Sequence, residues 1–107
     1  MTGIETRKPY YWTYTRHMWR FYVRHGSDPP DTMTEPRRLD VAACGTVFRR
    51  MNRIEQDTIR FFAVVPWSTS IGIAVHDYSD RCGIREQTVW AMIERALRNA
   101  AIERGLI

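Results

Sequence analysis

Lysine is almost absent from this sequence of 107 residues, which contains Lys8 and fifteen arginines. Guanidinium groups therefore carry nearly all of the positive charge, and the chain has a formal net charge of +4. Arginine presents a planar fork of donors that suits phosphate groups and guanine edges. A genome rich in G and C also favours arginine codons, so the bias permits a nucleic-acid partner and does not establish one.

Cysteine and histidine are also scarce. The two cysteines, Cys44 and Cys82, lie far apart, and the histidines, His17, His25 and His76, are scattered. No pair has the spacing of a zinc site, so we expect no metal, no cofactor and two buried, reduced thiols. Gly-rich phosphate loops and Gly-x-Ser-x-Gly motifs are missing too, and we expect no enzymatic activity.

Long apolar runs are missing as well. The longest, Phe61–Trp67, includes Pro66 and is far shorter than the ~20 residues that cross a bilayer. The N-terminus has no basic region followed by an apolar core, so we expect no signal peptide, no membrane partner and a cytoplasmic location. Hydrophobic residues make up 44% of the chain and charged residues 26%, which is typical of one globular domain rather than a disordered chain.

A run of aromatic residues, Tyr10–His25, has helical spacing. On a helix one side gathers apolar residues, and Arg16, Arg20 and Arg24 fall on the other side. The simplest interpretation is a core helix whose arginines point to water. The alternatives are an interface that stacks single-stranded bases and a helix that lies on a membrane surface. The expected apolar side comprises Tyr11, Tyr14, Met18, Phe21 and Tyr22, flanked by Trp12 and Trp19.

Three of the five prolines lie in the segment Gly26–Arg38, which also holds three acidic residues. This composition predicts a linker or an ordered loop. We therefore expect an N-terminal segment, residues 1–38, that contains an arm, the aromatic helix and the linker. A helical domain, residues 39–107, follows, and the two together form a single compact unit.

Beyond the linker the apolar spacing is helical. Asn52 and Glu55 form a near capping box, so we expect a helix that begins at Arg53 and ends at Pro66, and Ser70 can cap a short helix after it. The runs "RFFAVV" and "IGIAV" would suit strands by residue type alone. Their neighbours keep helical spacing, and the prediction is an all-α fold of about five helices. The expected buried positions are Val41, Cys44, Val47, Phe48, Met51, Ile54, Thr58, Ile59, Phe62, Val65, Ile71, Ala74, Val75 and Tyr78.

Gly83 separates two helical runs in a way that predicts a helix-turn-helix over about residues 71–105. Such a turn needs a residue that accepts positive φ and a small residue where the helices cross, and Gly83 and Ser79 suit these positions. Tyr78 and Cys82 are expected to point inward before the turn, and Ile84 to pack after it. The final helix then buries Val89, Met92, Ile93, Ala96, Leu97 and Ala100, with Trp90 at the edge of this face.

The outward side of the final helix begins near Arg85, and recognition helices enter the major groove with their first turns. Arginine can pair with guanine, glutamine with adenine, and glutamate can accept from cytosine. The net charge of this helix is small, so phosphate contacts are also needed from elsewhere. The expected DNA-contacting residues are Arg85, Glu86, Gln87, Thr88, Ala91, Glu94, Arg95 and Arg98, with phosphate contacts from Arg49, Arg50, Arg53 and Arg60, or from the stripe Arg16, Arg20 and Arg24.

The stretches "MNRIEQDTIRFFAVV" and "HDYSDRCGIREQTVWAMIERALRNA" resemble region 4 of sigma-70 factors, the promoter-reading domain. Its helix-turn-helix has the form A-x-x-x-G-I-S-x-x-T-V-x-x-x-x-x-x-A-L, and Arg85 stands where the usual Ser would cap the recognition helix. The ending of the chain and the aromatic first helix are similar to small phage regulators of the ArpU, RinA and antitermination-Q types. The positions that match the form are Gly83, Ile84, Thr88, Val89, Ala96 and Leu97.

The resemblance covers about Asn52–Ile107 and implies a transcription regulator, encoded by a phage or prophage, that binds double-stranded DNA. A second function stays open, because the same helices could dock on RNA polymerase or on a second copy of the chain. Trp67, Trp90 and the aromatic helix would then be the anchors, since Trp, Tyr and Arg dominate interface hot spots.

Overall fold

The computed structural model describes residues 8–26 and 30–107, and this part of the chain is all-helical, as predicted. The expected arm at residues 1–7 and residues 27–29 of the expected linker lie outside the described residues. The described residues contain no strand, so the strand alternative is wrong. None of their helices combines the length and apolar character needed to cross a bilayer. The five helices are α1 Trp12–His25, α2 Glu35–Arg50, α3 Arg53–Ala63, α4 Ile71–Cys82 and α5 Glu86–Arg104.

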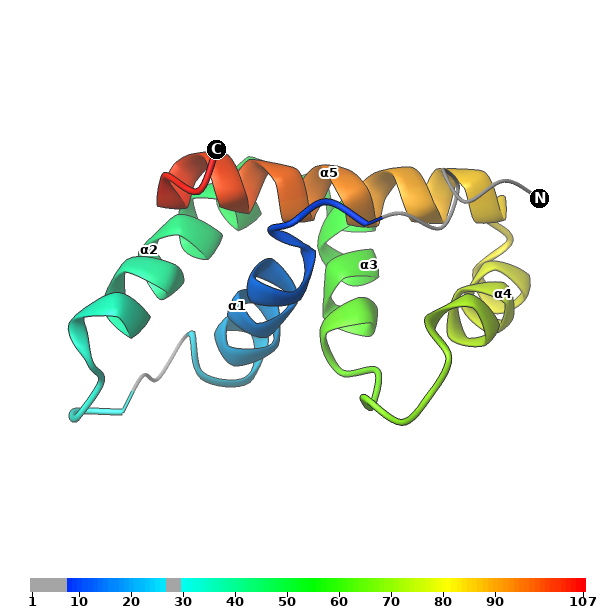
Figure 1. Cartoon of the computed structure of the whole chain (residues 1–107). Helices are drawn as coiled ribbons and strands as arrows, with labels where there is room; N and C mark the ends of the chain where they lie inside the picture. Colours follow the sequence, from blue (N-terminus) through cyan, green and yellow to red (C-terminus); the bar gives the residue numbers. More distant parts are fainter. Residues whose placement is uncertain (1–7, 27–29) are drawn as a thin grey trace.

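The longest helix, α5, is the element on which the other four helices pack. Its 19 residues form a rod of about 28 Å, and this rod runs across the top of Figure 1. In that view α4 lies under its first turns, α1 and α3 under its middle, and α2 beside its last turns. The packing of α5 therefore decides which of its sides remains for a partner.

Three helices begin at a residue whose side chain caps the first turn. Thr34 and Ser70 each accept the backbone N–H three residues further on, at the starts of α2 and α4. At the start of α3, Asn52 accepts the N–H of Glu55 at 2.9 Å, and the Glu55 carboxylate accepts the N–H of Asn52 at 3.0 Å. This capping box confirms the predicted start of α3 at Arg53.

The second helix starts earlier than expected. It begins at Glu35 rather than at Leu39, with Pro36 in its first turn. Proline is tolerated there because the first N–H groups of a helix have no acceptor within it. The proline-rich loop thus ends at Thr34, and the boundary expected between residues 38 and 39 lies inside α2.

The third helix ends earlier than expected, at Ala63 rather than at Pro66. Its buried side consists of Thr58, Ile59, Phe62 and Ala63. The prediction of a buried Ile54 is wrong, since this side chain is 56% exposed. With about 100° between successive residues, Ile54 points well to one side of the face that Phe62 centres.

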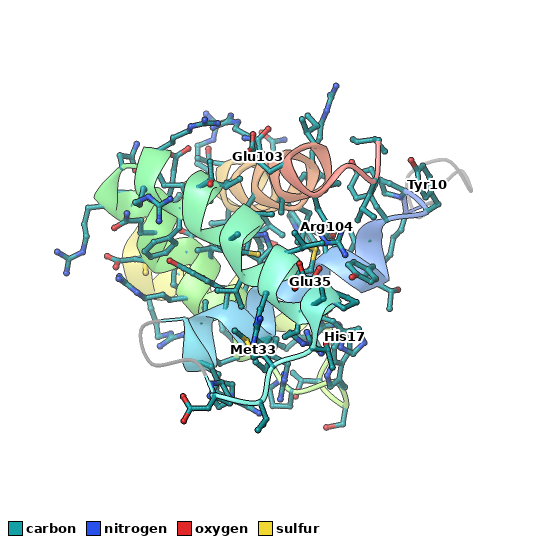
Figure 2. All side chains as sticks on the ribbon, turned by 90° about the vertical axis from the view of Figure 1, so that its left-hand side faces the viewer. Tyr10, His17, Met33, Glu35, Glu103 and Arg104 are labelled. Atoms are coloured by element: carbon teal, nitrogen blue, oxygen red, sulfur yellow. The ribbon has the colours of Figure 1, made fainter. Side chains whose placement is uncertain are left out.

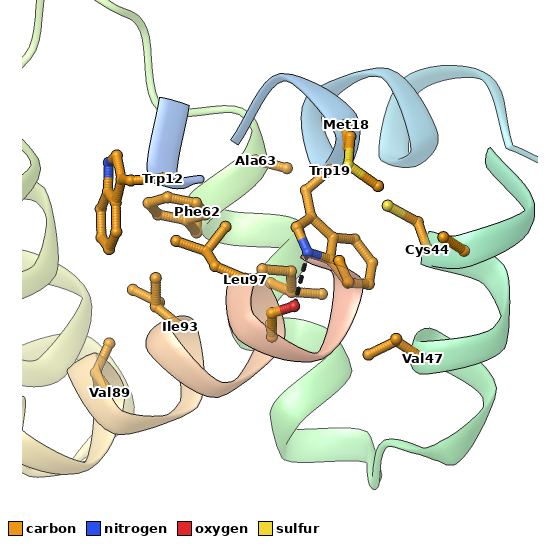
Figure 3. Close-up of a cluster of buried hydrophobic side chains, with 14 of the residues drawn as sticks. Trp12, Met18, Trp19, Cys44, Val47, Phe62, Ala63, Val89, Ile93 and Leu97 are labelled. Atoms are coloured by element: carbon orange, nitrogen blue, oxygen red, sulfur yellow. Dashed lines mark hydrogen bonds between the residues drawn. The ribbon is translucent and has the colours of Figure 1, made fainter. Parts of the chain in front are cut away.

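The core forms where α1, α2 and α3 meet α5, and Trp19 lies inside it (Figure 3). The Trp19 side chain has no exposed surface, and its indole Nε1–H donates to the backbone carbonyl of Ala96 at 3.1 Å. Met18 and Cys44 lie on one side of the indole ring, and Leu97 lies below it. A fully buried tryptophan removes 150–250 Å² from water, so this residue is a main anchor of α1.

The buried side of α1 is rotated by about 90° from the expected one. Trp12, Thr15 and Trp19 are buried, whereas Tyr14 is exposed. Two contacts with other helices set this rotation, from Trp19 to the Ala96 carbonyl and from Tyr14 to Asp40. Thr15 satisfies its hydroxyl by donating to the Tyr11 carbonyl at 2.8 Å, and so can be buried. The expectation that Arg16 points to water is wrong, because the rotation leaves Arg16 only 7% exposed.

A buried carboxylate, Asp40, joins α1, α2 and the end of α5. Its Oδ1 accepts from the Tyr14 hydroxyl at 2.9 Å and from Arg104 Nε at 2.8 Å, and Arg37 lies 3.8 Å from Oδ2. Partial burial of the Tyr14 hydroxyl, and next its hydrogen bond to Asp40, raise the pKa of Tyr14. The hydrogen bond with the same carboxylate raises the pKa of Arg104. Figure 2, viewed from the α2 side, shows Arg104 directed into this junction.

The chain bends at Gly83, which has a φ of +69°. The N–H groups of Gly83 and Ile84 both donate to the Ser79 carbonyl, at 2.9 and 3.2 Å, and the Ser79 hydroxyl donates to the Ile84 carbonyl. Figure 1 shows that α4 runs across the direction of α5. The positive φ matches the sequence prediction for this turn.

The two cysteines differ in environment and are not bonded to each other. Cys44 is buried, as expected, and its burial raises the pKa of the thiol. The prediction that Cys82 points into the core is wrong, since this residue is exposed. Cys82 is the last residue of α4, and the chain turns away directly after it.

We expect Gly83→Ala and Gly72→Ala to have opposite effects on stability. At Gly83 an added Cβ meets no atom, but the positive φ costs about 1–2 kcal/mol for an L-residue. At Gly72, inside α4, the added Cβ makes an ordinary 3.7 Å contact with Ser70, and the higher helix propensity stabilises by up to about 1 kcal/mol. Urea unfolding of both variants measures the difference. Equal effects would contradict the assignment of the turn.

Candidate nucleic-acid interface

All eight residues expected to contact DNA from the last helix are exposed. Six of them lie on the side of α5 opposite the buried Val89, Ile93 and Leu97, namely Gln87, Thr88, Ala91, Glu94, Arg95 and Arg98. Arg85 precedes α5 as its N-cap residue, and Glu86, the first residue of α5, is turned towards α4.

The first turn of α5 has no side-chain cap, as expected from arginine at this position. Arg85 instead donates from Nη2 to the Gln87 side-chain carbonyl at 3.3 Å. This hydrogen bond is long and lies on the surface, so it restrains both side chains only weakly. The N–H groups at the start of α5 are left for water or for a ligand.

Glu86 is held by α4. Its Oε2 lies 3.0 Å from His76 Nδ1, and Asp80 lies 3.5 Å from the other ring nitrogen. The hydrogen bond with Glu86, and next the charge of Asp80, raise the pKa of His76. This contact ties the first turn of α5 to the outer side of α4 and occupies a carboxylate that would otherwise repel phosphate.

The junction between α2 and α3 lies against the middle and the end of α5. Arg95 donates to Glu55 at 3.0 Å, and Arg50 lies 3.5 Å from Glu103. In Figure 2, Glu103 sits at the top of the molecule, beside the end of α2. Arg50 and Arg95 are exposed, so this junction borders the outward side of α5.

The four arginines expected as phosphate contacts are all exposed, but they do not share one place. Arg53 and Arg60 both pair with Asp57, at 3.2 and 3.1 Å. Arg60 also lies over the Phe48 ring, and Arg49 faces Tyr22 rather than α5. Of the four, Arg50 has an ion pair with α5, through Glu103, and ion pairs also reduce the excess charge of Arg53 and Arg60.

The sequence did not predict a cluster of cations between α1 and the connection from α3 to α4. Arg16 stacks on Trp67 with 3.9 Å from its guanidinium carbon to the ring centre, and Arg20 lies 5.9 Å from the same ring. The four-residue spacing of these arginines predicts a stripe along α1, either solvated or in contact with phosphate, but it does not predict that two of them meet at one carbonyl. The signal was Trp67, a large aromatic residue in a turn directly after Pro66.

Among the residues that the structure describes, no three His, Cys, Asp or Glu side chains are grouped so that they could hold a metal ion.

Comparison with known proteins yields no significant match to a family model, to a curated protein or to a solved structure.

We expect the pKa of His76 to lie above its ordinary value of 6.5 and to fall toward that value in Glu86→Gln. Because the folded state binds this proton more tightly, the contact stabilises the fold below about pH 6.5 and is lost as the pH rises through the raised pKa. A proton NMR titration of the imidazole measures the shift. Asp77→Asn is the matched control, since Asp77 makes the smallest contribution. An unchanged pKa in Glu86→Gln would contradict the contact.

Proposed function

We propose that the protein is a sequence-specific DNA-binding transcription regulator that reads the major groove with the first turns of α5. The observation that carries the proposal is the exposed side of α5, which begins at the bend next to Gly83. This side displays Arg85, Gln87 and Thr88 where no other described helix covers them. An exposed helix of about 10–12 Å diameter fits the major groove, which is about 12 Å wide.

The exposed side chains have suitable chemistry for base readout. Arg85 can donate two hydrogen bonds to guanine, and Gln87 can exchange two with adenine. Ala91, one turn beyond Gln87, leaves room for the backbone of the helix to approach the bases or a thymine methyl group. Thr88 and Arg98 can bind phosphates at the walls of the groove.

The resemblance to sigma-70 region 4 supports this proposal through the packing of the matched positions. Val89, Ala96 and Leu97 are buried, Ile84 is half-buried, and Thr88 faces solvent. Each therefore has the exposure that a helix-turn-helix needs at that position. Regulation of phage or prophage genes is the biological role that this resemblance favours.

A second candidate is a protein-interaction module that docks on RNA polymerase or on a second copy of the chain. Large apolar side chains are exposed around the connection between α3 and α4, namely Val64, Trp67 and Ile73. The aromatic helix is not available as an anchor in the folded chain, because Trp12 and Trp19 are buried. A tight dimer in sedimentation, together with no binding to any duplex at low salt, would favour this candidate.

The test of the proposal starts with selection of bound duplexes from a random DNA pool at about 100 mM salt. Base contacts predict a consensus sequence, whereas phosphate contacts alone predict none. In fluorescence anisotropy with the selected duplex, we expect Arg85→Ala and Gln87→Ala each to cost about 1–3 kcal/mol. Each variant should also lose preference at one base position.

Arg38→Ala is the matched control, because Arg38 is exposed and lies in the first turn of α2, at the opposite end of the molecule from the first turn of α5. It removes the same charge, and we expect little change in sequence preference. If Arg85→Ala and Gln87→Ala bind the selected duplex like the parent protein, α5 is not the reading helix.

A further inference from the structure

Two arginines of α1 converge on a single backbone carbonyl. Arg16 donates to the Val65 carbonyl from Nη2 at 3.3 Å, and Arg20 donates to the same oxygen from Nη1 at 3.0 Å. Trp67 supports both guanidinium groups from one side. The carbonyl oxygen satisfies one donor of each arginine and carries no net charge. Each planar guanidinium has five N–H donors, so its other donors are left for solvent or for a ligand.

This pair of cations has no carboxylate partner among residues 8–26 and 30–107. Among the described residues, neither Arg16 nor Arg20 forms an ion pair, whereas Arg37, Arg53, Arg60 and Arg104 each pair with a carboxylate. A buried charge is costly unless it is paired, and Arg16 is 7% exposed. Burial, and then the neighbouring charge of Arg20, lower the pKa of Arg16. An external anion at this place would offset both effects.

An open cleft of about 670 Å³ adjoins Arg16. Lys8 stands at its edge, 5.2 Å from the Trp12 ring centre, and Trp67 and Trp90 form apolar walls. The start of α4 also lines the cleft at Ile71 and Gly72, whose N–H groups have no acceptor within the helix. Glu94 is the one carboxylate among the residues that line the cleft. Its charge is outweighed by Lys8 and Arg16.

We propose that this cleft binds a phosphate group through Arg16 and Lys8, while Arg20, which lies beside Arg16 at the Val65 carbonyl and outside the lining of the cleft, adds positive charge. Guanidinium groups form paired hydrogen bonds with phosphate oxygens, and an ammonium adds a point charge. The amides at the start of α4 extend the same positive surface. The aromatic walls leave room for the organic part of the ligand.

Two sources supply this chemistry: the backbone of DNA and a free phosphorylated small molecule. The first source rests on the proposed function, because Glu94 belongs both to the cleft and to the outward side of α5. A duplex that lies along α5 would then pass its phosphates by the cleft. The second source is independent of DNA binding.

The test is a titration of the full chain with inorganic phosphate against chloride at equal ionic strength. The indole N–H resonances of Trp67 and Trp90, assigned from Trp67→Phe and Trp90→Phe, report on the cleft. We expect a saturable shift in the millimolar range. Lys8→Gln should weaken phosphate binding about tenfold, the effect of one charge-assisted hydrogen bond. Arg24→Gln, one turn beyond Arg20 on α1 and exposed, should bind like the parent.

Lys8 is exposed, so Lys8→Gln tests the site even if Arg16→Gln fails to fold. Unchanged phosphate binding in Lys8→Gln, or an equal shift with chloride, would overturn the proposal. Arg85→Ala should keep the phosphate response, which separates this site from the DNA-reading side. If Lys8→Gln also lowers the salt slope of DNA binding by about 0.9, the source is the DNA backbone. If that slope stays constant while phosphate binding weakens, the source is a free phosphorylated molecule.

Discussion

The fold depends on the attachment of α1 to α5, which is made by one indole. Trp19 has no contact with water, and its N–H donates to the Ala96 carbonyl, 77 residues later in the chain. A buried N–H without an acceptor would cost a few kcal/mol, so this bond fixes both the depth and the rotation of α1. The rotation of α1 then determines where Arg16 lies. Because α1 packs on one side of α5, the other side of α5 stays free of protein.

Ion pairing divides the arginines into two groups. Within the described residues, six arginines pair with a carboxylate of Asp40, Glu55, Asp57 or Glu103. Some of these pairs join two helices, and others lie within one helix. Surface pairs of this kind contribute little to stability, but they reduce the charge that is free to attract an anion. Arginines without such a partner include Arg85 and Arg98 on α5, and Arg16 and Arg20 on α1. Four arginines without a carboxylate partner among the described residues therefore belong to the two proposed sites.

Local signals in the sequence predicted much of the fold. Gly83, Asn52 with Glu55, and Ser70 act within a few residues of themselves, and each stands where the sequence placed it. The buried side of α5 was also predictable, because Val89, Ile93 and Leu97 repeat with the period of the helix. Six of the eight candidate contact residues follow from this period, because they lie on the opposite side of α5; Arg85 and Glu86 stand at its start and do not.

Other predictions were wrong because they concern features that are set by contacts between residues far apart in the sequence. The rotation of α1 is set by Trp19 meeting Ala96 and by Tyr14 meeting Asp40, and hydrophobic spacing within α1 contains neither contact. The exposure of Ile54 and Cys82 has a local cause instead: Ile54 points to one side of the buried face of α3, and Cys82 is the last residue of α4, directly before the turn at Gly83. The cation pair at Val65 could not be found from α1 alone, because the carbonyl and Trp67 that hold it come from the connection between α3 and α4.

The central claim is that α5 serves as core on one side and as a DNA-reading surface on the other. Its most direct test is a titration of the isotope-labelled full chain with the selected duplex, followed by backbone amide NMR. The account predicts large shifts for residues 85–91 and small ones for Trp19 and Ala96, which stay inside the fold. Shifts confined to α1 and α2, with the first turns of α5 unchanged, would contradict it.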